Sequence, residues 1–342
     1  MLLGQGQVAT RTARAAAGPK AWRNGIQNDD TNGGQTSVIV QFGLLALAWG
    51  SSFLLIKIGL DGLSPAQVVW CRLVFGAIAL GFIMLFTRQR VPRGLALWGH
   101  LTVVALLLTV IPFLLFSWAE LRISSGLASI YNATTPLMTV AVAALALSTE
   151  RLTRNRGIGL TLGFVGVLVV LGPWSLGAGG DLLAQLACLG ATACYGVAFA
   201  YLRRFVAGHG ASAVAVAFVQ VTIGAIVMLV STPWLAGGNI ELSVPVVASM
   251  VVLGAVGTGF AYIWNTNIVR AWGAANGAAV TYVTPIVGVA LGIAVLGEPL
   301  TWNQPVGALL VIAGILAAHG RLAGLLSRTR RRRAQETVAV TE

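Results

Sequence analysis

Ten blocks of apolar residues, each about as long as a membrane crossing, dominate this sequence. The blocks lie at 38–60, 66–87, 96–117, 126–147, 157–172, 182–202, 211–230, 244–266, 275–296 and 303–319. A helix needs about 20 apolar residues to cross the ~30 Å hydrocarbon core of a bilayer. Because these blocks do not alternate polar and apolar residues, they argue against a β-barrel. With 57% hydrophobic and 9% charged residues and a mean hydropathy of +0.84, the chain is predicted to be an all-α membrane protein.

Basic residues gather on one side of these blocks. If all ten blocks cross and the N-terminus is cytoplasmic, 19 of the 22 basic residues lie in cytoplasmic segments, while Arg122 lies outside. Cytoplasmic loops carry an excess of Lys and Arg. The blocks 157–172 and 303–319 are short enough to be re-entrant, but this asymmetry favours ten crossings. It also predicts a plasma (inner) membrane location with both termini cytoplasmic, and it makes the net charge of +12 a matter of topology, without a nucleic acid partner.

Two stretches of the chain are nearly the same. TPLMTVAVAALALSTERLT at Thr135 recurs as TPIVGVALGIAVLGEPLT at Thr284, and WGSSF at Trp49 matches YGVAF at Tyr195; FGAIAL and IGAIVM form a third match. A unit of five crossings enters the membrane inverted the second time, which explains why ERLTRNR has become EPLTWNQ, without arginines. The sequence predicts a five-plus-five inverted repeat, the architecture of a secondary transporter with its site between the repeats.

The same motifs resemble the ten-helix EamA family of the drug/metabolite transporter superfamily. WGSSFLLIKIGL, LASIYNATTPLMTVAVAALALSTERLT, GLTLGFVGVLVVL, VTPIVGVALGIAVLGEPLT and GALLVIAGILAA carry the resemblance over about 38–320. It implies export of small metabolites, often amino acids, or of toxic compounds. The second half has Gln220 where the first half has Arg72, so a symmetric basic pair is not expected.

The predicted organisation has four parts. Residues 1–36 are polar and glycine-rich and are expected to be a disordered cytoplasmic tail. The first EamA-like repeat covers 37–173 and the second, inverted repeat covers 181–320. Residues 321–342 form a basic cytoplasmic tail that is expected to contact anionic lipid. A homodimer is left open.

Arg72 is the first candidate for substrate binding. It lies about seven residues into its block, where a cation costs ~2.5–3.5 kcal/mol on insertion scales. Its side chain is therefore expected to face the bundle interior, where a guanidinium suits a substrate carboxylate or phosphate. The alternative is a structural arginine that bonds helix carbonyls or snorkels. Lys57 lies nearer the end of its block and either binds substrate or snorkels to the interface.

Polar and aromatic side chains complete the predicted site. Tyr131, Asn132 and Thr135 of SIYNATTP need protein or water partners, because hydrocarbon offers none, and interhelix bonding is the alternative to ligand contact. The remaining candidates carry an aromatic ring or an amide: Trp49, Trp118, Tyr262, Asn265 and Tyr282. Membership of an interfacial aromatic belt is the alternative for Trp49, Trp118, Tyr262 and Asn265. Interhelix bonding is the alternative for Tyr282. Aromatic walls with a few polar groups suit a zwitterionic or amphipathic ligand.

Residues typical of catalysis do not converge in this sequence. The acids of the core region, Glu120 and Glu298 among them, fall at block ends or in loops, so an enzyme is not expected. Glu150 and Glu298 are expected to cap helices or gate loops. The three cysteines have no metal-like spacing, and neither a metal nor a cofactor nor a catalytic residue is predicted. Small-residue spacing in the short blocks predicts close helix packing.

Several functions stay open beside metabolite export. Proton-driven carriers often use an Asp, Glu or His within the membrane, and the absence of a central acid favours facilitated export over proton antiport. A lipid or sugar-nucleotide carrier or a multidrug exporter is the alternative within transport. A non-transporting membrane scaffold and an intramembrane enzyme are the alternatives outside it.

Overall fold

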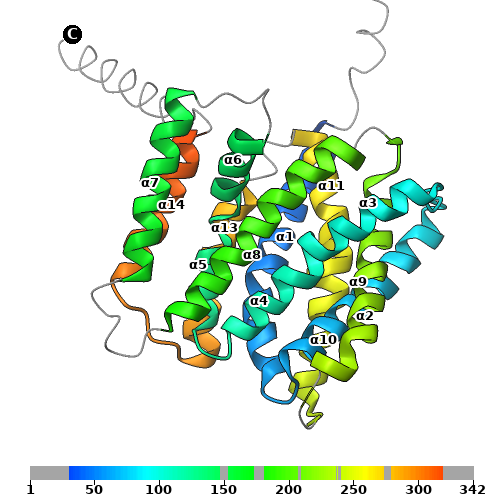
Figure 1. The fold of residues 1–342 in the computed structure, drawn as a ribbon, viewed down its shortest axis with the longest axis horizontal. Coiled ribbons are helices and arrows are strands. Elements are labelled where there is room, and N and C mark those ends of the chain that lie inside the picture. Colours follow the sequence, from blue (N-terminus) through cyan, green and yellow to red (C-terminus); the bar gives the residue numbers. More distant parts are fainter. Residues whose placement is uncertain are drawn as a thin grey trace, which may run out of the picture. The chain divides into compact units, whose positions relative to one another are not determined.

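The computed structural model describes residues 31–146, 153–172, 181–206, 209–235, 237, 240–272 and 279–318. Contacts divide the chain into two compact units, 1–40 and 41–342, and the second unit contains all the helices from Gln41 onward. The regular structure of the described residues is entirely helical (Figure 1). Helix α1 already begins at Thr31, so residues 31–36 are helical, although the sequence assigned them to the tail. Residues 1–30 of the predicted N-terminal tail lie outside the described residues, as do the predicted tail 321–342 and Glu150.

Among the described residues, seven helical segments are long and apolar enough to cross a membrane: Ser37–Leu60, Pro65–Phe86, Leu95–Ala119, Arg154–Leu171, Leu182–Val206, Ala213–Leu235 and Val244–Trp272. Two shorter apolar helices follow, α13 (Val280–Leu296) and α14 (Asn303–Ala318). Many large apolar side chains on these segments are exposed, for example Phe82 and Phe164. Such a surface suits hydrocarbon rather than water, and the chain is a multi-pass membrane protein.

Local sequence signals set the helix ends. Ser64 begins α2 (Pro65–Phe86) with a capping box in which Gln67 bonds back to the Ser64 backbone. Asp181 caps α8 (Leu182–Tyr201) and Thr153 caps α7 (Arg154–Leu171). These side chains accept hydrogen bonds from N–H groups that the first helical turn leaves unpaired.

The predicted block 126–147 is divided into two helices, α5 (Ser125–Asn132) and α6 (Thr135–Ala146). Pro136 has no N–H and cannot donate to the carbonyl of Asn132 four residues before it. The hydroxyl of Thr135 donates to that carbonyl instead, at 2.7 Å. The sequence predicted one continuous block over 126–147, and it did not predict that the helix ends at Asn132.

The described part of the chain contains three π-helical turns. Leu106–Val110 (η1) separates α3 (Leu95–Ala105) from α4 (Ile111–Ala119). Ala255–Phe260 (η5) separates α10 (Val244–Gly254) from α11 (Ala261–Trp272) in the same way. A third turn, Leu202–Val206 (η3), extends α8. Such turns are frequent at functional sites, and η1 and η5 occupy corresponding places in the two halves.

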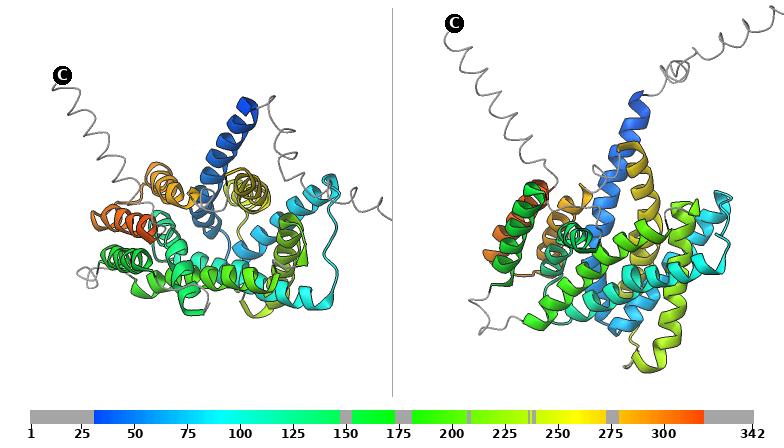
Figure 2. Two further views of the ribbon diagram at one scale, coloured as in Figure 1. Left: turned by 90° about the horizontal axis from the view of Figure 1, so that it is seen from above. Right: turned by 45° about the horizontal axis from the view of Figure 1, so that its top comes forward.

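Glycines bring α7 and α14 into backbone contact, as the sequence predicted. The two helices lie side by side in both views of Figure 2. A Cβ on Gly159 would lie 2.5 Å from the carbonyl oxygen of Gly314, and one on Gly307 would lie 2.7 Å from that of Gly166. Real Cβ atoms do not approach backbone atoms this closely, so only glycine fits at these positions.

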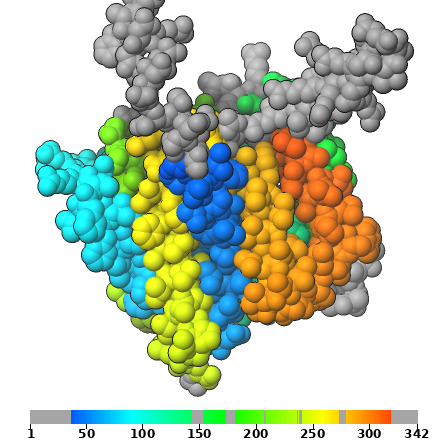
Figure 3. Space-filling view, turned by 180° about the vertical axis from the view of Figure 1, so that it is seen from behind, coloured from blue at the N-terminus to red at the C-terminus, as the bar shows by residue number. Residues whose placement is uncertain are grey.

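Two further pairs of matched glycines make matched contacts between the halves. Gly50 on α1 faces Val287 on α13, and Gly196 on α8 faces the Met138 backbone on α6. Val287 and Met138 occupy the same place after the repeated Thr-Pro motif. On the face shown in Figure 3, the Gln41–Leu60 part of α1 lies between α10–α11 and α13. Each half therefore packs its first helix on the Thr-Pro helix of the other half.

The second pair joins α2 to η5 and α9 (Ala213–Leu235) to η1. A Cβ on Gly76 would lie 2.9 Å from Thr258 Cγ2, and one on Gly224 would lie 2.9 Å from Thr109 Oγ1. Gly76 and Gly224 are the glycines of the matched FGAIAL and IGAIVM motifs. The two π-helical turns are thus each held by a glycine of the opposite half.

Candidate functional site

Arg72 lies on α2 with only 9% of its surface exposed. Its Nε donates a hydrogen bond to the Thr258 hydroxyl, 3.1 Å away, and its guanidinium lies 3.7 Å from the centroid of the Phe113 ring. Among the described residues no carboxylate forms an ion pair with it. A cation–π contact is worth ~0.5–2 kcal/mol, whereas burying an ion costs several kcal/mol. Arg72 is therefore a buried cation that its described neighbours compensate only in part.

A buried amide and two phenols lie around this cation. Gln220 on α9 is 1% exposed and donates from Nε2 to the Tyr262 hydroxyl at 2.7 Å. Its Oε1 has no hydrogen-bond partner among the described residues. Tyr195 and Tyr262 lie within electrostatic range of Arg72 and pack on the same apolar cluster as Phe113. We call Arg72, Phe113, Gln220, Thr258 and Tyr262 the Arg72 cluster.

The Arg72 cluster draws corresponding residues from the two halves. Arg72 on α2 and Gln220 on α9 are counterparts in the repeat alignment. Phe113 and Tyr262 are also counterparts, because each follows the threonine of its π-helical turn, Thr109 or Thr258, by one helical turn. The first half therefore contributes a cation on an aromatic face, and the second contributes an amide on a phenol.

Tyr131, Asn132 and Thr135, which the sequence assigned to the site, form bonds between and within helices. The Tyr131 hydroxyl donates to Gln185 Oε1 on α8 at 2.6 Å, and it is almost fully buried. Thr135 donates to the Asn132 carbonyl. These contacts agree with the interhelix alternative for Tyr131, and a role in substrate binding for all three stays a prediction.

Lys57 and Trp118 lie near the loop between α4 and α5 rather than in the Arg72 cluster. The Lys57 ammonium donates to the Glu120 carbonyl and, at 3.1 Å, to the Ile123 carbonyl. The Arg122 guanidinium lies 4.1 Å from the Trp118 ring centroid. Lys57 is thus bound to carbonyls at the end of α4 and in the loop that follows it, and its role in substrate binding stays a prediction.

The other predicted site residues, Trp49, Asn265 and Tyr282, are half-buried. Tyr282 packs on the apolar cluster that contains Tyr131. Their place in a substrate pathway stays a prediction. Tyr262 is the predicted aromatic candidate that joins the Arg72 cluster, through its hydrogen bond with Gln220.

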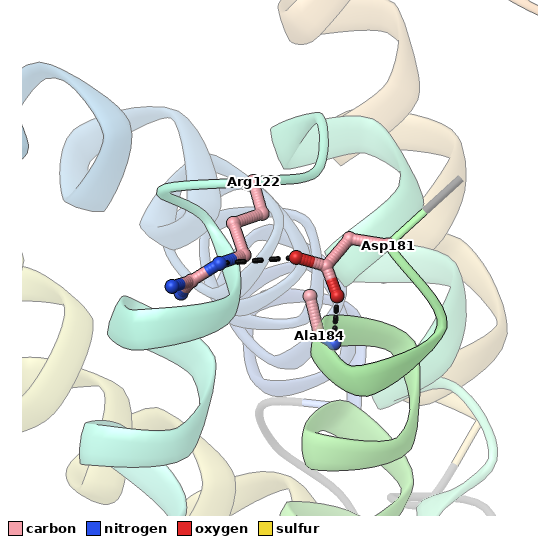
Figure 4. Close-up of polar contacts among 3 residues, drawn as sticks. All are labelled: Arg122, Asp181 and Ala184. Atoms are coloured by element: carbon pink, nitrogen blue, oxygen red, sulfur yellow. Dashed lines mark hydrogen bonds and ion pairs between the residues drawn. The ribbon is translucent and has the colours of Figure 1, made fainter. Parts of the chain in front are cut away.

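A set of polar contacts closes the end of the unit where α4 meets α5. Glu298, which follows α13, accepts hydrogen bonds from the backbone N–H groups of Ser125 (2.7 Å) and Gly126 (3.0 Å) at the start of α5. The predicted capping role of Glu298 is thereby confirmed. Arg122 forms an ion pair with Asp181 at 3.0 Å, and Asp181 also caps α8 through the Ala184 N–H (Figure 4). We call these contacts, with those of Lys57, the α4–α5 latch.

Sequence reasoning missed three members of the Arg72 cluster, and Tyr195 beside it, as site residues. Phe113, Thr258 and Tyr195 look like ordinary apolar-block residues, and Gln220 was noted only as the counterpart of Arg72. The repeat alignment carried the available signal, because it pairs Phe113 with Tyr262 once η1 and η5 are matched. The complete burial of Glu120 (0% exposed) had no signal in the sequence.

A surface cavity of about 470 Å³ lies elsewhere, lined by Arg88, Arg90, Arg93 and His209 among others. Arg72 does not line it, and its arginines are those expected in a cytoplasmic loop. In the described parts of the chain, no three His, Cys, Asp or Glu side chains are grouped as a metal site would require.

These features define a class of protein: a multi-pass helical membrane protein with a partly compensated cation buried between two similar halves. The chain belongs to the EamA-like transporter family, whose model matches residues 36–172 and again 182–318. The protein is accordingly a membrane transporter.

Named relatives agree with this class. The chain is 28% identical over 290 residues to a probable amino-acid metabolite efflux pump of Salmonella typhimurium, covering 80% of this chain and 91% of the relative. It is 27% identical to a probable terminal-alkyne amino-acid exporter of Streptantibioticus cattleyicolor, covering 82% and 93%. A solved crystal structure with 18% identity superposes with a TM-score of 0.60 over 86% of this chain and 98% of that one, which shows a shared fold.

Proposed function

We propose that this transporter exports small metabolites that carry an anionic group beside an apolar part, amino acids foremost. The observation that carries the proposal is Arg72: a buried guanidinium with one hydrogen bond, one aromatic contact and no ion pair among the described residues. A substrate carboxylate would compensate its charge through a planar two-point contact. The rings of Phe113 and Tyr262 would contact the apolar part.

The mechanism that we propose is alternating access between two inverted five-helix repeats, 37–173 and 181–320. Support comes from the matched contacts: α1 on α13 with α8 on α6, α2 on η5 with α9 on η1, and α7 on α14. Each contact joins an element of one half to an element of the other half, and it recurs with the two halves exchanged. A site at such an interface can open to either side when one half rocks on the other.

Ten crossings with both termini cytoplasmic complete the proposal, with the basic tail 321–342 against anionic lipid. Reporter fusions at Arg90 and Arg154 are expected to be cytoplasmic, and a fusion at Asp181 is expected to be outside. A cytoplasmic Asp181 would contradict this orientation.

The test of function is flux from proteoliposomes loaded with a 14C-labelled mixture of the protein amino acids. Liposomes that contain the wild-type protein are expected to release label faster than protein-free liposomes loaded with the same mixture. Arg72→Gln is expected to lower the rate severely and Arg72→Lys to lower it in part, because lysine keeps the charge but loses the planar fork. Thermal stability in detergent is the control, since a structural arginine would lose stability in step with activity.

A sugar-nucleotide carrier or a lipid carrier is the second candidate, because a phosphate suits Arg72 as well as a carboxylate does. The same liposomes loaded with a labelled nucleotide sugar test it. The relatives named as amino-acid exporters are the observation that favours the amino acids over phosphate-bearing substrates or a broad range of drugs.

A further inference from the structure

Glu120 has an unusual place for a carboxyl group. It follows α4 directly and is 0% exposed. Neither of its carboxyl oxygens has a hydrogen-bond partner among the described residues. A buried polar group without a partner costs free energy, and for a carboxylate this cost is much larger than for a neutral carboxyl group.

A second buried polar side chain accompanies it. Ser117 lies one helical turn before Glu120 on the same face of α4. Its hydroxyl is 1% exposed and is also without a partner among the described residues. Two buried and unpartnered polar side chains therefore lie on one face of α4 at the end where Lys57 binds the Glu120 carbonyl.

The ionisable groups around Glu120 do not neutralise it. Lys57 on α1 faces it, but the Lys57 ammonium binds the Glu120 backbone carbonyl rather than its carboxyl group. Arg72 on α2, Glu298 after α13 and Cys188 on α8 also lie within electrostatic range. Glu298 is already bound to the start of α5. Glu120 lies beyond the end of the Leu95–Ala119 span. Burial raises the pKa of its carboxyl group well above its usual range, and the positive charge of Lys57 opposes this increase.

We infer that Glu120 is a proton-binding site that is occupied when the α4–α5 latch is closed and is emptied when the latch opens. On closing, a proton from water adds to one carboxylate oxygen and forms an O–H bond; on opening, that bond breaks and the proton returns to water. No electrons are transferred. The proton is thus a second ligand of the transporter beside its substrate.

Linkage gives the direction of the effect. The closed state binds one more proton than the open or unfolded state at any pH between the ordinary carboxyl pKa, ~4.3, and the raised pKa of Glu120. The closed state is therefore most favoured at the acidic end of this window. The equilibrium constant for closing the latch falls by up to about tenfold for each unit that the pH rises. If this end faces outward, which rests on the proposed function, acid outside promotes closing after substrate release.

The first experiment does not depend on transport. Thermal unfolding of the purified full chain is followed from pH 5 to pH 8 for the wild type, Glu120→Gln and Asp181→Asn. Glu120→Gln mimics the neutral group and is expected to remove the loss of stability that the wild type shows as the pH rises. Asp181→Asn removes an acid of the same latch that is paired with Arg122, and it is the control that keeps the wild-type slope. An equal slope in wild type and Glu120→Gln overturns the inference.

The second measurement uses the wild type alone, so it stands even where Glu120→Gln fails to fold. The infrared spectrum at pH 7 is expected to contain the carbonyl stretch of a protonated carboxylic acid, and its absence overturns the inference.

In the liposome assay, wild-type export is expected to rise as the external pH falls, and export by Glu120→Gln is expected to be insensitive to the external pH. If the wild type shows the pH dependence of stability and the infrared band but no amino-acid flux, the proposed function is contradicted and the inference about Glu120 stands.

Discussion

The two halves of this transporter share their packing but differ in their chemistry at the centre. Both halves use a glycine to approach the opposite half at corresponding places, as Gly76 and Gly224 do against η5 and η1. At the centre, however, Arg72 in one half corresponds to Gln220 in the other, and Phe113 corresponds to Tyr262. Packing constrains both copies because each glycine contact is needed for the fold. The polar residues at the centre need not match between the halves, because a single cation is enough to bind the single anionic group of the proposed substrate.

The largest expected effect tests the shared packing. Gly159→Leu and Gly307→Leu each place a side chain where the backbone of the facing helix lies. Overpacking costs typically 1–3 kcal/mol, and because backbone cannot rotate away we expect about 3 kcal/mol of lost stability from each. Thermal unfolding in detergent measures both.

The control is Gly43→Leu on α1, where no atom lies within 4 Å of the added Cβ, and its stability is expected to be unchanged. A strong difference between Gly159→Leu and Gly307→Leu would show that the two halves do not contribute equally to packing.

The sequence predicted the helical class, the positions of the apolar segments and the packing glycines, because each depends on local composition. It placed Arg72 in the interior from the cost of a cation in hydrocarbon. It could not predict Phe113 and Thr258 as the partners of Arg72, because these contacts depend on how η5 orients Thr258 within it and how η1 rotates Phe113 after it. Nor could it predict that Tyr131 binds Gln185 while Tyr262 binds Gln220, since both tyrosines look alike in sequence.

The next effect tests the different chemistry. Exchanging the counterparts, Arg72→Gln with Gln220→Arg, keeps the composition and moves the guanidinium to the other half. We expect flux of labelled amino acids to stay about 10–100-fold below the wild-type rate, which corresponds to losing one charge-assisted contact worth ~1.5–3 kcal/mol. The moved guanidinium would meet the Tyr262 phenol instead of the Phe113 face. Recovery to near the wild-type rate would mean that the halves are chemically equivalent.

A smaller effect is expected from Tyr262→Phe, which makes the second half resemble the first. The substitution removes the hydroxyl that accepts from Gln220 and leaves a buried amide without that bond. The expected loss of stability is about 1–2 kcal/mol. Phe113→Tyr is the matched variant, since it adds a hydroxyl at the corresponding position of the first half. Unchanged thermal stability of Tyr262→Phe would show that the Gln220 bond does not stabilise the site.

The smallest effect concerns Arg122, the exposed cation of the α4–α5 latch. Its ion pair with Asp181 is partly exposed on both sides, 41% and 29%, and exposed pairs contribute only ~0–1 kcal/mol. Arg122→Gln is therefore expected to lower stability by less than about 1 kcal/mol and to leave flux unchanged. Asp181→Asn completes a double-mutant cycle, because asparagine still caps α8 through the Ala184 N–H while the charge is lost. Glu298 and Lys57, rather than this ion pair, are expected to hold the latch closed. A coupling energy well above 1 kcal/mol between Arg122 and Asp181 would contradict that expectation.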